Sequence, residues 1–119
     1  MMEIEINKSD HILYLMPKGE LNKNDLKSLS DAIDNYINEG NLIKGLLVDT
    51  ESVPHWKDLS AFKAHLEVIR EKGKILNKVA VVSDNNNVMM LSQLIKLFID
   101  SEVKHFDHIN KSEAIDWLK

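Results

Sequence analysis

The sequence lacks cysteine entirely and holds only four glycines and two prolines. Without cysteine there is no disulfide, no thiolate metal site and no cysteine nucleophile. The four glycines are scattered and form neither a G-x-G-x-x-G motif nor a P-loop, which argues against nucleotide binding through a glycine-rich loop. The N-terminal stretch has no basic segment followed by an apolar one, and no run is long enough to span a bilayer. Neither a signal peptide nor a transmembrane helix is therefore expected.

Charge and length narrow the class of protein further. Lysine and arginine number 15 against 19 aspartates and glutamates, so the formal net charge is −4. An acidic chain without a basic stripe is a poor nucleic-acid binder, because phosphate contacts need concentrated positive charge. The 119 residues fit a single domain, residues 1–119, that buries one core. We expect a cytoplasmic protein, and attachment at the membrane periphery stays open.

Alternating apolar residues open the chain. Ile4 and Ile6 lie between polar residues, a period of two that is typical of a half-buried strand. Residues 8–10 have the composition of a polar turn, and residues 12–16 form a second extended run. Two short strands joined by a tight turn predict a β-hairpin.

A helix is predicted after the hairpin. Asn22 or Asn24 caps its first turn, because an asparagine side chain accepts hydrogen bonds from free backbone N–H groups. Gly40 is a natural stop for the same helix. Its apolar face consists of Leu26, Leu29, Ile33, Tyr36 and Ile37.

Strands and helices alternate over the rest of the chain. Buried strands are expected over three mostly apolar runs, residues 43–48, 79–82 and 103–106. Three more helices are expected, one from Asp58 to Gly73 with the apolar face Leu59, Phe62, Leu66 and Ile69, one over residues 88–99, and one capped by Ser112. The order β-β-α-β-α-β-α-β-α predicts a layered α/β fold whose sheet is mainly parallel after the hairpin.

Acidic and aromatic residues follow the predicted central strand. Asp49 and Glu51 lie at its carboxyl end, where open α/β sheets bind ligands, but acidic residues also suit an ordinary turn. Trp56 stands in a loop between a strand and a helix, where it either anchors a partner or covers the core. His55 and His65 have no positioned partner in the sequence, and we expect both on the surface.

A short cluster of His105, Asp107 and His108 follows the last predicted strand. Two histidines and an aspartate at this spacing match no established zinc ligand set, and a solvated turn is the simpler interpretation. No metal or other cofactor is therefore predicted.

Ser60 falls in the first turn of the helix that follows Asp58. A helix N-terminus concentrates free N–H donors and the positive end of the helix dipole, which favours a phosphate group there. Ser60 is thus a candidate phospho-acceptor, although serine also occurs in first turns as a local hydrogen-bonding residue.

The helix predicted over residues 88–99 carries more apolar residues than one core-facing side needs. Its predicted core face is Val88, Leu91, Leu94, Ile95 and Phe98. Met89, Met90 and Leu97 fall away from that face. Either this surplus contacts a partner, a lipid or a second subunit, or the helix is packed more deeply than a two-layer fold would give.

Four stretches of the chain carry a family resemblance: HILYLMPKGELNKNDLKSL, GLLVDTESVPHWKDLSAFKAHL, KVAVVSD and EVKHFDHINKSEAIDWLK. In order and spacing they resemble the SpoIIAA-like proteins of the STAS (sulfate transporter and anti-sigma factor antagonist) fold group. The most specific parts are the aromatic loop at residues 56–59, which enters a helix, and the last strand with residues 114–118.

The resemblance implies an α/β fold of the SpoIIAA-like (STAS) type. This fold is a mixed sheet of about four to five strands, opened by a hairpin, with about four helices mainly on one face. The resemblance also implies no enzymatic activity.

The resemblance further implies a candidate phospho-switch. In anti-sigma factor antagonists, a partner kinase phosphorylates a serine at the start of the helix after the third strand, and the added charge switches kinase binding off. The antagonist pattern there is Asp-Ser-Ser-Gly, which Asp58 and Ser60 match and Leu59 and Ala61 do not. Trp56 is a further departure, since the antagonists lack it.

Two functions are carried forward as hypotheses. The first is a non-enzymatic regulatory module that binds a protein partner or a second copy, as in a homodimer, through residues 53–62. Its binding candidates are Asp49, His55, Trp56, Asp58 and Leu59.

The alternative is an apolar-ligand (lipid) or peripheral membrane protein, since the SpoIIAA-like branch resembles CRAL-TRIO-type lipid carriers in topology. It would use the Trp56 loop and the helix over residues 88–99, with Met89, Met90 and Leu97 at the contact. The charge of −4 argues against simple docking on anionic lipid. A weak enzyme based on Asp49, Glu51 or His55 ranks third.

Overall fold

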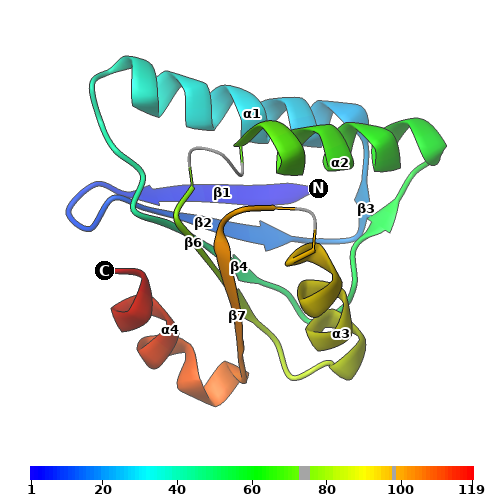
Figure 1. Cartoon of the computed structure of the whole chain (residues 1–119). Coiled ribbons are helices and arrows are strands. Elements are labelled where there is room, and N and C mark those ends of the chain that lie inside the picture. The colour runs from blue at the N-terminus through cyan, green and yellow to red at the C-terminus, as the bar shows by residue number, and fades with distance from the viewer. Residues whose placement is uncertain (73–75, 98) are drawn as a thin grey trace.

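The computed structural model describes residues 1–72, 76–97 and 99–119, and the side chains of Leu59, Phe62, Leu66 and Ile69 lie outside the description. In chain order the elements are β1 (Met2–Asn7), β2 (Ile12–Pro17), β3 (Glu20–Leu21), α1 (Lys23–Asn38), β4 (Gly45–Asp49), β5 (His55–Trp56), α2 (Leu59–Lys72), β6 (Lys78–Val82), α3 (Asn86–Ile95), β7 (Glu102–Phe106), the 3₁₀ turn η1 (His108–Asn110) and α4 (Lys111–Leu118). The described residues thus form four α-helices around a mixed sheet (Figure 1).

The main sheet has the strand order β1-β2-β4-β6-β7 within the described residues. β1 and β2 pair antiparallel as the predicted hairpin, and β2, β4, β6 and β7 run parallel. Leu47 of β4 lies between Tyr14 of β2 and Ala80 of β6, so β4 is the middle strand. The α/β fold expected from the sequence is confirmed.

Helices cover both faces of this sheet. α1, α2 and α3 lie on one face, where Leu46 and Val48 of β4 belong to the larger apolar cluster. α4 lies on the other face, where its Ala114 packs with Leu47 in a second cluster (Figure 1). Successive residues of a strand point to opposite faces, so β4 contributes to both clusters. Three helices on one face and one on the other agree with the expectation of helices mainly on one face.

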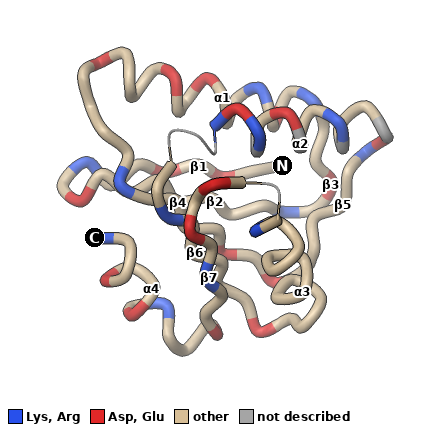
Figure 2. The backbone as a smooth tube through the Cα atoms, viewed as in Figure 1, with Lys and Arg blue, Asp and Glu red and all other residues tan. Residues whose placement is uncertain are grey.

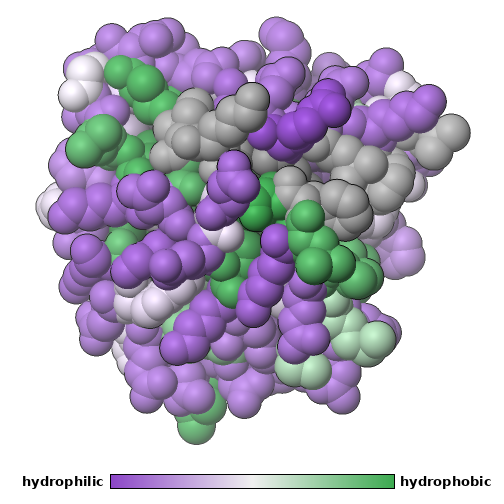
Figure 3. Space-filling view, in the orientation of Figure 1, coloured by the Kyte–Doolittle hydropathy of each residue, from purple (hydrophilic) through white to green (hydrophobic). Residues whose placement is uncertain are grey.

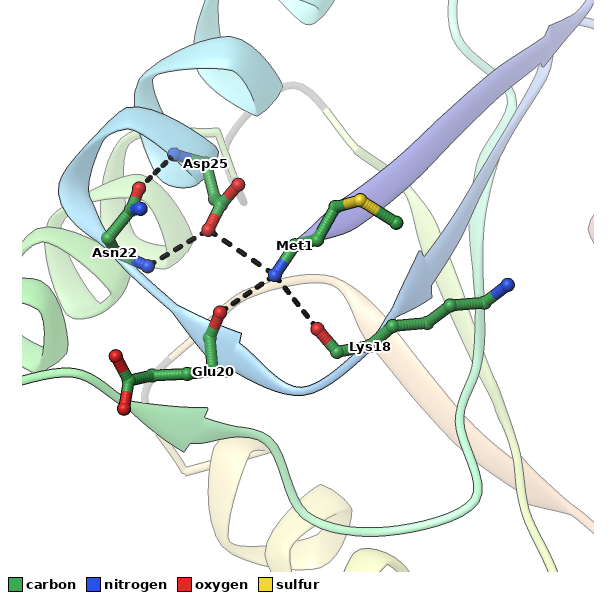
Figure 4. A network of polar contacts seen from close by, with 5 residues as sticks. All are labelled: Met1, Lys18, Glu20, Asn22 and Asp25. Atoms are coloured by element: carbon green, nitrogen blue, oxygen red, sulfur yellow. Dashed lines mark hydrogen bonds and ion pairs between the residues drawn. The ribbon is translucent and has the colours of Figure 1, made fainter.

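Asn22 caps α1, which settles the choice between the two asparagines. The Asn22 side-chain oxygen accepts from the Asp25 backbone N–H at 3.0 Å, and the Asp25 carboxylate accepts from the Asn22 backbone N–H at 2.9 Å. The same carboxylate lies 3.6 Å from the Met1 amino group, which also donates to the backbone carbonyls of Lys18 and Glu20 (Figure 4). The capping box therefore ties the start of α1 to the hairpin.

Removing this cap is expected to weaken the fold measurably. Asn22→Ala should lower the free energy of unfolding by about 1 kcal/mol, because the Asp25 N–H loses its acceptor. Asn24→Ala changes an exposed residue two positions further along the chain and should alter the free energy of unfolding by less than about 0.5 kcal/mol. Urea unfolding followed by circular dichroism compares the two. Equal losses would show that the side-chain cap does not stabilise α1.

Several predicted boundaries are wrong. α3 begins at Asn86 because Asn85 caps it. It ends at Ile95, where the last turn closes early: the Leu97 N–H donates to the Leu94 carbonyl at 3.1 Å. Ser112 does not cap α4, whose N-cap is Asn110. The expected stop at Gly73 and the expected face at Phe62, Leu66 and Ile69 lie outside the described residues, as does Phe98.

Candidate functional site

The chain between β4 and α2 pairs with a distant strand before it enters α2. We call residues 53–62 the Trp56 segment; it contains β5 and the first turn of α2. β5 pairs parallel with β3, so Trp56 lies opposite Leu21, and the Lys57 N–H donates to the Leu21 carbonyl at 2.8 Å. Leu21 is fully buried, so this pairing anchors the segment to the core. Neither of these two-residue strands was expected from the sequence.

Trp56 is held to α2 by a histidine. Its indole Nε1–H donates to Nδ1 of His65 at 2.8 Å, and the two ring centroids lie 5.5 Å apart. Both side chains are half-buried, and burial lowers the pKa of His65 below its usual value. Because Nδ1 accepts a hydrogen bond, the imidazole is neutral with its proton on Nε2.

His65 was expected on the surface, and that expectation is wrong. On α2, the described residues that turn inward are Ala61, His65, Val68 and Lys72, spaced four, three and four residues apart. This spacing is that of one helical face, and it is the signal in the sequence that could have found His65. His55, in contrast, is exposed as expected.

The start of α2 is capped by Asp58. Its Oδ1 accepts from the Ala61 backbone N–H at 2.9 Å, as the sequence predicted for an N-cap. Ser60 is the second residue of α2 and is half-buried. The side chain of Leu59 lies outside the described residues.

Two grooves border the Trp56 segment. One, of about 540 Å³, runs from Val53 through Trp56 to Asn85 and Asn87 at the start of α3. We call it the Trp56 groove. The other, of about 300 Å³, lies where the starts of α1 and α2 meet and is lined by Asn22, Lys23, Asn24, Lys57 and Asp58. The second groove joins two helix N-termini and two lysines, so its potential favours negative charge.

An apolar cavity of about 150 Å³ lies between the sheet and the helices α1 to α3. Aliphatic side chains of the sheet, such as Val48 and Val81, line it together with Val68 of α2 and Val88 of α3. His65 also lines this cavity, so a single side chain contacts both the cavity and Trp56.

α3 and Leu97, two residues after its end, turn an apolar stripe to solvent. Met90, Leu94 and Leu97 are 60%, 55% and 78% exposed, whereas Met89 is only half-buried. Leu94 was expected in the core, and this is wrong: among the described residues of α3, Val88 and Ser92 are the buried ones. No charged residue occurs between Asn86 and Ile95, and apolar surface gathers over this helix (Figures 2 and 3).

The remaining polar candidates lie at the carboxyl ends of the parallel strands. Asp49 lines an open cleft of about 770 Å³ together with Glu51, Asp84 and His108. Its carboxylate accepts from the Lys111 ammonium at 2.7 Å, which ties β4 to α4.

His105 of β7 and His108 of η1 make hydrogen bonds to the loop that follows β6. The His105 Nε2 lies 2.6 Å from the Ser83 carbonyl oxygen, and the His108 backbone N–H donates to Asp84 at 2.9 Å. Over residues 1–72, 76–97 and 99–119, no group of three acidic or histidine side chains is arranged to hold a metal ion. None of the helices in these ranges is both long and apolar enough to cross a bilayer.

The sheet order and the helix placement define a layered α/β protein with a mixed five-stranded main sheet. The sequence matches the SpoIIAA-like family over residues 12–119, and the chain belongs to that family. No curated protein matches the sequence.

Two solved structures share the fold. One is an uncharacterised protein with a SpoIIAA-like fold from Shewanella loihica PV-4, 21% identical, with a TM-score of 0.76 over 100% of this chain and 93% of that one. The other is the phosphorylated form of the Bacillus cell fate determinant SpoIIAA, 15% identical, with a TM-score of 0.60 over 100% of both chains. At these identities, the likeness shows the fold alone.

Proposed function

We propose that this protein is a non-enzymatic regulatory module of the cytoplasm that binds a protein partner, or a second copy of itself, through the Trp56 segment. The observation that carries the proposal is the way Trp56 is held. The hydrogen bond to His65 and the β3–β5 pairing fix a half-exposed indole beside a groove before any partner arrives.

A fixed tryptophan is well suited to recognition. Truncation of aromatic residues at interfaces is often among the most costly changes, and a side chain ordered in advance loses little conformational freedom on binding. His55 and Asp58 border the same segment and add polar contacts at its rim. Asp49 belongs to the neighbouring cleft, where its ion pair with Lys111 gives it a structural role and makes it a poor candidate for a catalytic acid or base.

Ser60 is proposed as the regulatory position of this surface. The resemblance to anti-sigma factor antagonists points to it, and one solved neighbour of the fold is a phosphorylated SpoIIAA. Asp58, two residues before Ser60, lines the groove between the starts of α1 and α2. Lys23 and Lys57 line the same groove, and their positive charges attract a phosphate. Phosphorylation would add a charge of about −1.5 to −2 to the Trp56 segment and change what the segment binds.

The test compares a variant of Trp56 with a variant of an exposed apolar residue outside the Trp56 segment. Partners captured from cells of the source organism are identified, produced pure and titrated by calorimetry, and self-association is measured by sedimentation. Trp56→Ala should weaken the affinity by about 30-fold, which corresponds to about 2 kcal/mol. Ile109→Ala, at a position that is 87% exposed in η1, should leave it unchanged.

Failure has a clear form in this experiment. If the unmodified protein binds neither a partner nor itself, or if both variants bind as it does, the Trp56 segment is not the contact. Ser60→Glu should weaken binding while Ser60→Ala preserves it; equal binding by both would remove the phospho-switch from the proposal.

A second candidate function is binding of an apolar ligand or peripheral attachment to a membrane. Two observations favour it: the apolar cavity and the exposed stripe Met90, Leu94 and Leu97, with Met89 beside it. Native mass spectrometry would detect a co-purified lipid, and sedimentation with phosphatidylcholine vesicles would detect attachment. Leu97→Ser should reduce vesicle binding, whereas Leu42→Ser, equally exposed but away from α3, should not. Protein free of lipid that does not sediment with vesicles would exclude this candidate.

A further inference from the structure

The contact between Trp56 and His65 joins the Trp56 segment to α2 by a hydrogen bond that depends on an unprotonated nitrogen. We propose that these two residues form a proton-operated latch: protonation of the His65 imidazole at mildly acidic pH releases the Trp56 indole from α2 and loosens the Trp56 segment. The latch concerns the contact of Trp56 with His65. Its bearing on partner binding rests on the proposed function.

The chemistry of the contact makes it a switch. The Trp56 indole is a donor only, and His65 accepts through Nδ1 at 2.8 Å. A protonated imidazole carries a hydrogen on both nitrogens and has no acceptor to offer. Protonation at Nδ1 therefore places one N–H against another, and the hydrogen bond to α2 is lost.

On the cavity side, the described surroundings of His65 give the proton no compensating charge. The described residues that line the cavity from α1, α3 and the strands of the main sheet are uncharged, and the one charged residue of the described lining is Lys72 of α2. Lys72 is itself a cation, paired with Asp34 of α1 at 2.6 Å. On the side of the segment, His55, Lys57 and Asp58 flank Trp56 in the chain, and Glu20 of β3 lies opposite His55.

Burial therefore favours neutral His65 in the closed arrangement, and the pKa of His65 is lowered by that burial. A histidine released to solvent has an ordinary pKa of about 6.5. The open arrangement then binds the proton more tightly than the closed one, so acidification shifts the population toward the open state. Between about pH 6.5 and the lowered pKa, each pH unit shifts the ratio by up to about tenfold. Above about pH 6.5 the latch is closed and insensitive to pH.

Release of Trp56 would affect both the Trp56 groove and the apolar cavity. Pro54 lines the Trp56 groove and also the apolar cavity, and His65 is the polar side chain between Trp56 and that cavity. Release of Trp56 thus changes the shape of the groove and the access to the cavity together.

The experiment follows Trp56 alone. In a Trp117→Phe background Trp56 is the single tryptophan, and quenching of its fluorescence by acrylamide is measured from pH 8 to pH 5. The quenching constant should rise severalfold on acidification, with far-UV circular dichroism unchanged. Adding His65→Gln, whose amide oxygen accepts the indole N–H but does not titrate, should abolish the rise. Adding His55→Gln, the exposed neighbour in the same segment, should leave the rise intact.

Three results would overturn the latch. They are a quenching constant that stays flat with pH, an equal rise in the His65→Gln protein, and a rise that coincides with loss of circular dichroism. If His65→Gln does not fold, NMR of the single-tryptophan protein decides: the Trp56 indole proton and the His65 ring protons should shift with one midpoint, and different midpoints refute the latch. Partner binding is not used in these measurements, so the latch and the proposed function fail separately.

Discussion

Leu47→Ala is expected to lower the free energy of unfolding by about 2–5 kcal/mol, a large part of the about 5–15 kcal/mol that holds a domain of ordinary stability. Leu47 is fully buried on the middle strand of the sheet. It packs in the cluster beneath α4 with Ile12, Ala80 and Leu118. Alanine at this position loses the transfer energy of the missing atoms and leaves a cavity that flanking strands cannot close.

Leu42→Ala is the matched control for this change. The same atoms are removed from a side chain that is 76% exposed in the loop before β4, so the loss should stay below about 0.5 kcal/mol. Urea unfolding curves of the three proteins give the comparison. A cost below about 1 kcal/mol for Leu47→Ala would mean that the core under α4 is not packed as described.

Gly45→Ala should destabilise the protein by about 1–3 kcal/mol, because α4 packs directly on this glycine. A Cβ at position 45 would lie 2.6 Å from Cδ2 and 3.1 Å from Cβ of Leu118. Leu118 is itself almost fully buried and has little room to move. The added methyl group therefore pushes the end of α4 away from β4.

A double-mutant cycle identifies the cause of that cost. Leu118→Ala removes the Cδ2 and Cγ atoms that the new methyl group meets, although the Cβ of residue 118 remains. In the Leu118→Ala background, Gly45→Ala should therefore cost clearly less than it does alone. Equal costs in the two backgrounds, measured by urea unfolding, would attribute the effect to the strand itself.

Much of this fold could be predicted because its signals are local. The alternation of Ile4 and Ile6 identified the hairpin, and the helical face of α1 was found with its members buried or half-buried. Asp58 was recognised as a cap because it bonds a backbone N–H only three residues away. Interactions between residues close in the sequence depend little on the rest of the molecule, so they can be predicted from the local sequence alone.

The face of α3 shows where a local pattern fails. Periodicity groups Leu94 with Val88, but the helix packs near the β7 edge of the sheet, against β6 and β7. At the edge of the sheet, a helix buries only a narrow part of its surface, and Val88 and Ser92 are the buried residues of α3 among those described. The side of a helix that is buried depends on what covers it, which its own spacing does not contain.

The candidate site divides in the same way. Trp56, Asp58 and Ser60 stood out in the sequence because each residue type has a known role at the start of a helix or in a loop. His65 did not, because its hydrogen bond to Trp56 spans nine residues and forms only when the loop folds back on α2.

By itself, the sequence determined the order of the five main-sheet strands and the four helices, the Asp58 cap of α2 and the family to which the chain belongs. Only the tertiary structure decided the pairing of β3 with β5, the contact of Trp56 with His65 and the ion pair of Asp49 with Lys111, which are 62 residues apart. The physical reason is one of distance along the chain. Neighbouring residues meet in any helix or turn, whereas distant residues meet only after burial of the apolar clusters has brought their elements together.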